Sequence, residues 1–340
     1  MPSWIAEIAR AEGGKISFER FMELALYDPD RGYYTRNIPA IGTSGDFATA
    51  TTVSDQIARS IANWLRAEAR HLALPRLNVI ELGAGNGELA RDILRTIRPW
   101  ERVQYQIVET SGPLRKVQER TLRGRRIRWQ AAIEPALEAA EGEAMVISNE
   151  FVDAFPHRRF EYTAGGWREI TIALDAGSWR EHLDPISSMP GSGVFSIQWM
   201  AGQRVETLGS YRLWLAKMVP HLLRGSILTI DYGGSPSEIY YRKPRGTTRA
   251  FFRHERLQEM EIYFRAGFQD LTADVNFIDL QGWGEALGLT TVHFSTQADF
   301  IRKWTSTGGC LGEGPHTYIS NPDEMGTAVK VLHQRLSQGR

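Results

Sequence analysis

The stretch at residues 78–91, NVIELGAGNGELAR, constrains the fold of this 340-residue chain more than any other. The run VIEL at residues 79–82 is apolar and β-branched, which is typical of a buried strand. It is followed by three alternating glycines, Gly83, Gly85 and Gly87. Beyond the glycines the apolar positions recur three to four residues apart, which is helical spacing. The sequence therefore predicts a strand, a tight glycine turn and a helix.

Such a turn brings the unpaired N–H groups of a helix N-terminus to the carboxyl edge of a sheet, where a nucleotide-like ligand can bind. A dinucleotide fingerprint requires glycine at its sixth position, but the sixth position here is Glu88, whose carboxylate would repel a pyrophosphate. The glycine spacing, preceded by Glu81, instead resembles the first motif of S-adenosylmethionine-dependent methyltransferases, whose ligand carries no phosphate. The alternative is a glycine turn that only lets the strand and the helix pack together.

A second acidic residue supports a bound nucleoside. The next expected strand, residues 103–108, ends in Glu109, about 26 residues after Gly83. In nucleotide-binding folds an acidic residue at this place holds the ribose, because a carboxylate can accept two hydroxyl hydrogen bonds. Alternatively, Glu109 only caps the helix that begins near Ser111. Because of the glycines upstream, we favour the ribose role.

The composition narrows the classes of partner. The 40 basic and 40 acidic residues cancel, so nucleic acid is not an expected partner. The single cysteine, Cys310, excludes an internal disulfide framework and a cysteine-based zinc site, and no metal is expected. No apolar run approaches the roughly 20 residues that span a bilayer, and no targeting pattern is present at the N-terminus. We expect a soluble, cytoplasmic protein, and the sequence leaves a homodimer open.

The fourth expected strand, residues 144–148, leads into the segment NEFVDAFP at residues 149–156. In an α/β sheet, chemistry takes place at the carboxyl end of the strand next to the cofactor. Methyl transfer is an in-line displacement, so the enzyme positions the nucleophile and, for a guanidinium, holds it with carboxylates while a proton leaves. Glu150 is therefore the first candidate for the guanidinium or amine contact, Asp153 is the second, and Asn149 lies beside them.

These polar residues also have a purely structural interpretation. Asn149 could cap the following turn, and Asp153 could form a surface ion pair with Arg158 or Arg159. We favour the catalytic role because of their position in the predicted sheet rather than because of their residue types.

The rest of the chain is expected to form the following elements: two short helices within residues 2–26, a helix at 57–73, a short third strand at 127–129, antiparallel strands within 158–183, a helix at 203–223, a fifth strand at 226–230 ending in Asp231, the last two strands at 270–277 and 291–294, helices at 278–287 and 297–304, and a terminal helix at 324–336. In related folds the residues after the third strand flank the adenine, which makes Gln130 a candidate contact.

Two further segments have alternative interpretations. Residues 42–49 combine small polar side chains with one aspartate, and they form either a ligand-facing lid or an ordered loop. Residues 240–256 interleave basic and aromatic side chains, which could bind an acidic peptide or RNA. We favour a solvated loop for the second segment.

Several motifs resemble the MidA-like methyltransferase family, which includes the mitochondrial complex I assembly methyltransferase. They are FMELALYDPDRGYY, GDFATATTVS, ELGAGNGELARDIL, YQIVETSGPLRKVQ, ISNEFVDAFPHRRF and the DYG that begins at Asp231. The resemblance implies an α/β fold of the class I S-adenosylmethionine methyltransferases, with a Rossmann-like seven-stranded sheet, S-adenosylmethionine as cofactor, and symmetric dimethylation of an arginine in a respiratory complex I subunit. It also favours the lid, which makes Gly45, Asp46 and Thr49 candidate cofactor contacts.

One departure from the family keeps other functions open. The family commonly has a Pro-Glu pair where this chain has Thr51 and Thr52. The alternatives are a small-molecule or peptide N- or O-methyltransferase of the same fold and a non-catalytic assembly factor that binds the cofactor. The partner is then a protein or a small molecule. We divide the chain into a helical cap with its lid loop (1–75), a methyltransferase core (76–157 and 225–304), a substrate-side β and helical insertion (158–224) and a C-terminal tail (305–340).

Overall fold

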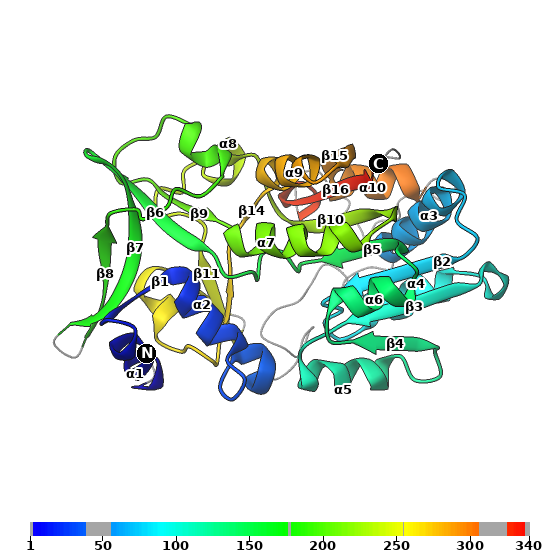
Figure 1. Ribbon diagram of the computed structural model, residues 1–340, viewed down its shortest axis with the longest axis horizontal. Helices are drawn as coiled ribbons and strands as arrows, with labels where there is room; N and C mark the ends of the chain where they lie inside the picture. The colour runs from blue at the N-terminus through cyan, green and yellow to red at the C-terminus, as the bar shows by residue number, and fades with distance from the viewer. Residues whose placement is uncertain (1–2, 39–55, 176–177, 254, 306–324, 337–340) are drawn as a thin grey trace.

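The computed structural model describes residues 3–38, 56–175, 178–253, 255–305 and 325–336, and these form two adjoining lobes (Figure 1). The larger lobe is an α/β unit, and the smaller one is built on an antiparallel sheet. The predictions for Gly45, Asp46, Thr49, Thr51 and Thr52 lie outside the described residues. None of the helices within the described ranges is long and apolar enough to cross a membrane.

A mixed sheet forms the centre of the larger lobe. Its main strands are β2 (Leu77–Leu82), β3 (Val103–Val108), β4 (Ile127–Gln130), β5 (Glu143–Asn149), β10 (Arg224–Gly234), β15 (Leu289–Thr296) and β16 (Val329–Leu336). They lie in the order β4-β3-β2-β5-β10-β16-β15, and the short β14 (Val275–Asn276) pairs with the end of β10. All pairs from β4 to β10 are parallel, whereas β16 is antiparallel to both of its neighbours. The seven-stranded sheet is the predicted one, but its final antiparallel hairpin pairs β15, which contains the expected strand at 291–294, with β16 rather than with the expected strand at 270–277.

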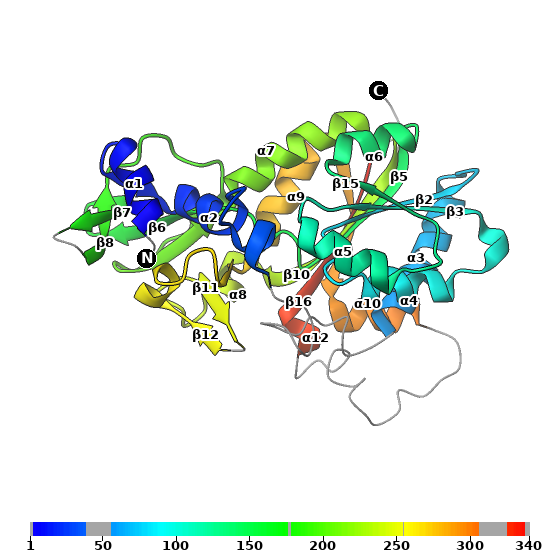
Figure 2. The same cartoon turned by 90° about the horizontal axis from the view of Figure 1, so that it is seen from below.

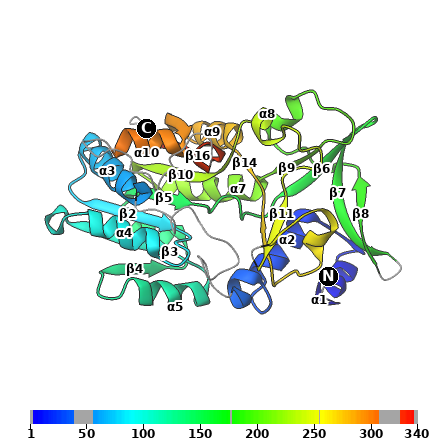
Figure 3. The ribbon, with the colours of Figure 1, turned by 180° about the vertical axis from the view of Figure 1, so that it is seen from behind.

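Helices cover both faces of this sheet (Figures 1 and 3). One face packs against α3 (Gln56–His71), α4 (Glu88–Thr96) and α10 (Gln297–Trp304), and the other against α6 (Ile133–Ala139), α7 (Gly209–Met218) and α9 (Phe277–Ala286). The central strands β2, β5 and β10 are buried along most of their length because both faces are covered. In β2, for example, Val79 joins the cluster under α3, while Ile80 joins the opposite cluster. The crossover helix α5 (Gly112–Thr121) lies between β3 and β4 in the chain.

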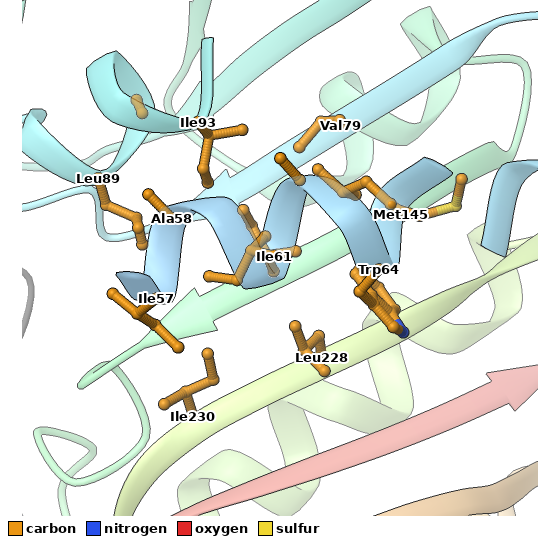
Figure 4. Close-up of a cluster of buried hydrophobic side chains, with 14 of the residues drawn as sticks. Ile57, Ala58, Ile61, Trp64, Val79, Leu89, Ile93, Met145, Leu228 and Ile230 are labelled. Atoms are coloured by element: carbon orange, nitrogen blue, oxygen red, sulfur yellow. The ribbon is translucent and has the colours of Figure 1, made fainter. Parts of the chain in front are cut away.

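The helix α3 shows how the apolar spacing predicts packing. Ile57, Ile61 and Trp64 recur at three- and four-residue intervals and are almost fully buried. Figure 4 shows these side chains pointing toward Val79 of β2 and Leu228 of β10. Because a single Leu or Ile buried in this way contributes about 1.5–3 kcal/mol, this interface accounts for much of the stability of the larger lobe.

The smaller lobe is built on an antiparallel sheet of five strands. Its strands are β1 (Lys15–Ser17), β6 (Arg158–Thr163), β7 (Gly166–Asp175), β8 (Ser178–Asp184) and β9 (Arg204–Thr207). They lie in the order β1-β7-β6-β9, with β8 paired to β7. The N-terminal helices α1 (Ser3–Ala11) and α2 (Phe18–Tyr27) pack near this sheet, and the side chain of Ser17 caps α2 by accepting from the Arg20 amide. The predicted helical cap and antiparallel insertion are therefore both present.

A third sheet of three short strands lies below α2 in Figure 2 and packs into the core of the smaller lobe. It consists of β12 (Glu255–Leu257), β11 (Arg249–Phe252) and β13 (Asp270–Thr272), in that order. The short helix α8 (Pro236–Ile239) precedes it in the chain. The expectation of a solvated loop over residues 240–256 is thus wrong for this part, because Thr248 and Arg249 are buried and Ala250 lies in the core of the smaller lobe.

Three other local expectations differ from the structure. Residues 324–336 form a one-turn helix, α12 (Met325–Ala328), and then β16, because the segment pairs with β10 and β15 on its two edges. Residues 203–223 begin with β9 before α7 starts. Residues 270–277 contain β13 and β14, which belong to different sheets. In a strand that is buried on both faces, the apolar pattern does not distinguish strand from helix.

The position of β16 differs from the predicted division of the chain into domains. This strand lies within the central sheet, although the division assigns it to a C-terminal tail. The boundaries at residues 75, 157, 224 and 304 otherwise remain predictions.

Candidate active site

The glycine turn after β2 requires glycine at each of its three positions. Gly83, Gly85 and Gly87 have φ angles of 58°, 54° and 81°, in the left-handed region that other residues rarely adopt. A Cβ atom on Gly83 would lie 2.8 Å from the Phe151 ring, and Gly87 is the residue at which α4 begins. The turn therefore allows close approach of the backbone to whatever occupies the space beside it.

That space is a pocket of about 120 Å³ at the carboxyl edge of the sheet. Its lining includes Glu81 from β2 and Gly85 from the turn after it, Glu109 and Leu114 from the segment after β3, and Glu150 from the turn after β5. No lysine or arginine is among the described residues that line it. Because three glutamates face the pocket, it suits a neutral or cationic ligand better than a pyrophosphate.

Glu109 lines the pocket and also accepts two hydrogen bonds from other residues of the protein. Its Oε1 accepts from the Ser111 amide at 2.8 Å, and its Oε2 accepts from Nε2 of Gln118 at 2.8 Å. Burial raises the pKa of Glu109, and these two hydrogen bonds oppose the shift. Each carboxylate oxygen has two acceptor sites, so Glu109 can accept further hydrogen bonds from a ligand. Glu109 can therefore cap the helix that begins near Ser111 and bind the ribose at the same time, so the two interpretations are compatible.

Gln118 is a structural residue that the sequence did not single out. It is fully buried on the inner face of α5. Besides Glu109, its Nε2 donates to the carbonyl of Gly85 at 3.0 Å, and its Oε1 accepts from Nε1 of Trp129 at 3.0 Å. Gln118 thus joins the glycine turn to the acidic residue across the pocket. A glutamine four residues after the buried Leu114, on the same helix face, was the available signal.

Two other predicted contacts take different positions. Glu81 lines the pocket, but it is buried and its Oε2 accepts from the Tyr105 hydroxyl at 2.8 Å. Burial and the nearby Glu109 raise the pKa of Glu81 to about 7, against the effect of the Tyr105 hydrogen bond. Gln130 is not among the residues that line the pocket, and its carbonyl accepts from the Glu109 amide at 3.0 Å. Its contact with adenine stays a prediction.

The end of β5 forms a strained turn. Glu150 has a φ angle of 52°, which is unusual for a residue with a side chain. Oδ2 of Asp231 accepts from the amides of Phe151, Val152 and Asp153 at 3.2, 2.9 and 3.2 Å, and so holds this turn. Asp231 is fully buried, and burial together with the charge of Glu150 raises its pKa to about 7. Strain of this kind is common where a side chain is held in position for function.

The three predicted acceptor-side residues lie close to each other on this turn. Nδ2 of Asn149 donates to Oε1 of Glu150 at 3.3 Å, and both residues line the pocket. Oδ1 of Asn149 is buried and has no hydrogen-bond partner within the described part of the chain. Asp153 is buried, and the expected alternative pairing with Arg158 or Arg159 is wrong, because these arginines pair with Glu169 and Glu181.

A second, larger cavity of about 800 Å³ adjoins the pocket. Glu150 and Tyr34 line both, and Asp153 and Asp270 line the second. The Tyr34 hydroxyl donates to Oδ1 of Asp270 at 2.7 Å. Burial raises the pKa of Asp153 well above its usual range, and the nearby Asp231 and Asp270 raise it further. Carboxylic groups thus gather where the two cavities meet, an arrangement that can hold two reactants side by side.

Tyr27 and Tyr34 complete the junction. Their rings stack at 5.6 Å, and the Tyr27 hydroxyl donates to the carbonyl of Ala154 at 2.9 Å. Tyr34 belongs to a π-helical turn, η1 (Tyr33–Asn37), and its carbonyl accepts from the Ser111 hydroxyl at 2.5 Å. The sequence analysis placed both tyrosines in the motif FMELALYDPDRGYY but did not assign either of them to the site.

Comparison with known proteins places this geometry in a family. Residues 57–295 match the family Methyltransf_28, which is described as "Putative S-adenosyl-L-methionine-dependent methyltransferase". The chain is also 27% identical over 296 residues to "Protein arginine methyltransferase NDUFAF7, mitochondrial" of Danio rerio, an alignment that covers 78% of this chain and 67% of that protein. The homologue from Drosophila melanogaster is 26% identical, with 78% of this chain and 65% of that protein covered. The chain thus spans about two thirds of the length of these relatives.

Two solved structures of similar proteins support the same family. The crystal structure of a COG1565 superfamily member from Burkholderia thailandensis, bound to S-adenosyl-homocysteine, superposes with a TM-score of 0.87 at 26% identity and covers 99% of this chain and 92% of that chain. A native crystal structure of a COG1565 superfamily protein from the same organism has a TM-score of 0.82, again at 26% identity and with the same coverage. The expected fold class is therefore confirmed. The chain belongs to the MidA-like family of S-adenosylmethionine-dependent methyltransferases, and its cofactor is S-adenosylmethionine.

Proposed function

We propose that this protein transfers a methyl group from S-adenosylmethionine to an arginine side chain of a protein. The observation that carries the proposal is the junction of the two cavities, where Glu150, Asp153 and Asp270 face a space large enough for a peptide segment. A guanidinium remains protonated at any ordinary pH, and a group of carboxyls is the partner it requires. The names of the relatives from Danio rerio and Drosophila melanogaster support the same activity.

The smaller pocket fits the cofactor on three counts. Glu109 can accept hydrogen bonds from the two ribose hydroxyls. The unpartnered Oδ1 of Asn149 can accept from the ammonium group, and the acidic lining favours the positive sulfonium. The glycine turn leaves room for the nucleoside to approach the backbone. When bound, the cofactor supplies an electrophilic methyl group.

The chain itself contributes orientation and proton transfer. Glu150 lines both cavities from a turn held by Asp231, so we assign it the contact that orients the guanidinium. Asp153 has a raised pKa in the empty cavity, and the positive charge of an entering arginine lowers this pKa. The ionised carboxylate of Asp153 can then take, on an Oδ atom, the proton that the nitrogen loses. None of the described residues that line either cavity lies within the antiparallel insertion at residues 158–224, so its role on the substrate side stays a prediction.

The proposal is tested by methyl transfer from the tritium-labelled cofactor. Arginine peptide libraries, matched lysine libraries and a small-molecule extract are the acceptors, and mass spectrometry identifies the methylated atom. We expect methylarginine in the peptides. Glu150→Gln should lower kcat at least about a hundredfold, because both orientation and charge are lost. Calorimetry should show unchanged affinity for S-adenosyl-homocysteine. The exposed Glu138→Gln is the matched control and should have wild-type activity.

Other outcomes distinguish the alternatives. Label that appears only in the small-molecule fraction would replace the proposal with a small-molecule methyltransferase. Binding of S-adenosyl-homocysteine without transfer to any fraction would indicate an assembly factor that retains the cofactor pocket. Full activity of Glu150→Gln would show that the acceptor-side assignment is wrong.

A further inference from the structure

The three-stranded sheet β12-β11-β13 supplies one wall of the larger cavity. Phe251 of β11 lies directly opposite Arg256 of β12 on one side and Asp270 of β13 on the other. Residues paired in this way point to the same face of a sheet, and all three line the cavity. Ala250, one position away along β11, faces the core of the smaller lobe. The cavity wall is therefore a row with an acidic end, an aromatic centre and a basic end.

The acidic end adjoins the cofactor pocket. Asp270 is held there by the hydroxyl of Tyr34, which lines both cavities. Asp153 is close enough to Asp270 for the charge of one to raise the pKa of the other. Glu150 completes this end, which is where the proposed function places the guanidinium.

The basic end carries more positive than negative charge. Lys243 and Arg249 both pair with Asp274, at 2.7 and 2.6 Å. The side-chain amide of Gln258 lies beside Arg256. With its oxygen turned toward Arg256, this amide accepts a hydrogen bond from Nη2 of Arg256 at 2.8 Å. No carboxylate within the described residues pairs with Arg256. Three cations thus gather around Asp274, and Arg249 also lies within electrostatic range of Asp153.

The direction of the pKa shift of Arg256 agrees with this excess of positive charge. Partial burial lowers its pKa, and the neighbouring Arg249 lowers it further, against the effect of Asp274. The two guanidinium groups therefore repel each other across the cavity wall, and an anion between them would relieve the repulsion. Guanidinium groups bind carboxylates in a bidentate geometry, so a carboxylate is the anion that fits.

We propose that the acceptor segment carries an acidic side chain close in sequence to the methylated arginine, and that Arg256 together with Arg249 binds this acidic side chain. This inference rests on the proposed function. Adjacent strands lie about 4.8 Å apart, so the two ends of the row are separated by roughly 10 Å. An extended peptide rises about 3.3 Å per residue, which puts the acidic residue within about three positions of the arginine. Phe251 lies between the two charged ends and can pack against the intervening chain.

The test on the substrate side uses three sets of peptides with arginine at the centre. Each flanking position, from three before to three after the arginine, carries Asp, its neutral isostere Asn, or Lys. We expect kcat/KM to follow the order Asp, Asn, Lys at one of these positions. The ratio between Asp and Asn should be about 5- to 20-fold, as for a partly exposed charge-assisted hydrogen bond.

The test on the protein side uses Arg256→Gln, which removes the charge from an exposed side chain. The ratio between Asp and Asn peptides should fall to about one, because the Asp peptide loses its charge-assisted contact, while the affinity for S-adenosyl-homocysteine stays unchanged. Arg256→Glu should instead favour the Lys peptide. Arg265→Gln is the matched control, because Arg265 is exposed and packs over Phe252 without lining the cavity. It should keep the wild-type preference.

Two results overturn the inference while the proposed function stands. One is a wild-type protein that methylates the Asp, Asn and Lys peptides equally well. The other is an Arg256→Gln variant that slows transfer to all three by the same factor. If folded protein that binds S-adenosyl-homocysteine methylates no arginine peptide, the proposed function is contradicted, and this inference falls with it.

Discussion

Asp231 connects the fifth parallel strand to the turn that carries the proposed acceptor-side residues. Its carboxylate accepts from the amides of Phe151, Val152 and Asp153, and Glu150 has a left-handed backbone immediately before them. A left-handed residue with a side chain is unfavourable by about 1 kcal/mol or more, so the turn depends on bonds of this kind. At the scale of single residues, the site is therefore shaped by a buried carboxyl that lines neither cavity.

The raised pKa of Asp231 predicts a specific dependence of stability on pH. Between pH 3.8 and about 7 the folded state holds a proton that the unfolded state has released. The free energy of unfolding that this group contributes is therefore present at low pH and is lost as the pH rises through this window. Asp231→Asn cannot titrate, so the stability of the wild type relative to the variant should decrease from pH 4 to pH 7.

Urea unfolding of both proteins at several pH values measures this difference. Glu81, whose pKa is also raised to about 7, titrates in both proteins and cancels from the comparison. Parallel stability curves over the whole window would show that Asp231 is already ionised in the folded protein at low pH.

At the scale of elements, the loop before β11 is fixed by one buried carboxylate. Glu206 of β9 accepts from the amides and hydroxyls of Thr247 and Thr248, at distances between 3.0 and 3.3 Å. The hydroxyl of Tyr240 lies 3.2 Å from the same carboxylate. This contact orders the residues that lead directly into Arg249 and the wall of the larger cavity. Glu206 is thus a positioning residue for that wall.

We expect Glu206→Gln to affect the acceptor and not the cofactor. The amide has one acceptor oxygen instead of two, so one or two hydrogen bonds to the loop are lost, at about 1–3 kcal/mol. KM for the peptide should rise roughly tenfold, while calorimetry shows the wild-type affinity for S-adenosyl-homocysteine. Glu255→Gln, an exposed change on β12, should leave both quantities unaltered. Equal losses of acceptor and cofactor binding would indicate a general loss of structure instead.

At the scale of the whole molecule, the last strand is joined to the first helix of the larger lobe by Glu68. Its Oε1 accepts from the Ser226 hydroxyl and from Nε of Arg335, both at 2.6 Å, and its Oε2 accepts from Nη2 of Arg335 at 3.0 Å. Burial alone would raise the pKa of Glu68, but hydrogen bonds from Arg335 and Ser226, together with His333 at 3.4 Å, hold this pKa well below its usual range. One carboxylate therefore joins α3, β10 and β16.

Glu68→Gln should destabilise the protein without changing the site. Removing the charge leaves Arg335 without its buried partner, which costs about 2–4 kcal/mol. Because the pKa of Glu68 is lowered in the folded state, its stabilising effect is present above about pH 4.5 and is lost as the pH falls further. Urea unfolding at pH 7 should show the full loss, and the difference should shrink below pH 4. An unchanged midpoint at pH 7 would mean that the interaction contributes little.

The sequence was most informative where local chemistry leaves one choice. The glycines at 83, 85 and 87 predict their turn because only glycine adopts three successive turn conformations of this kind without strain. Glu109 and Glu150 could be placed at the same edge of the sheet because the carboxyl ends of parallel strands meet there. The spacing of Ile57, Ile61 and Trp64 predicted a helix and its buried face.

The sequence was least informative where a segment depends on distant partners. The stretch that forms β16 fits a helix or a strand by its own pattern, and it becomes a strand because β10 and β15 offer their edges to it. In the same way, the basic and aromatic side chains at residues 240–256 could bind a ligand or face solvent. The pairing of β11 with β12 and β13 turns some of them toward the cavity and others toward the core.

By itself, the sequence thus predicted the glycine turn and the position of the polar residues at the strand ends, because these depend on backbone conformation and on periodicity within one element. The fold family and the cofactor followed from the resemblance of its motifs to those of known methyltransferases. Only the tertiary structure decided that Gln118 connects the two sides of the pocket, that Asp231 holds the turn of Glu150, and that Asp270 and Arg256 lie at opposite ends of one wall. The reason is physical: hydrogen bonds and charge pairs act over a few ångströms, and residues far apart in the sequence come within that range only after the sheets and helices have packed.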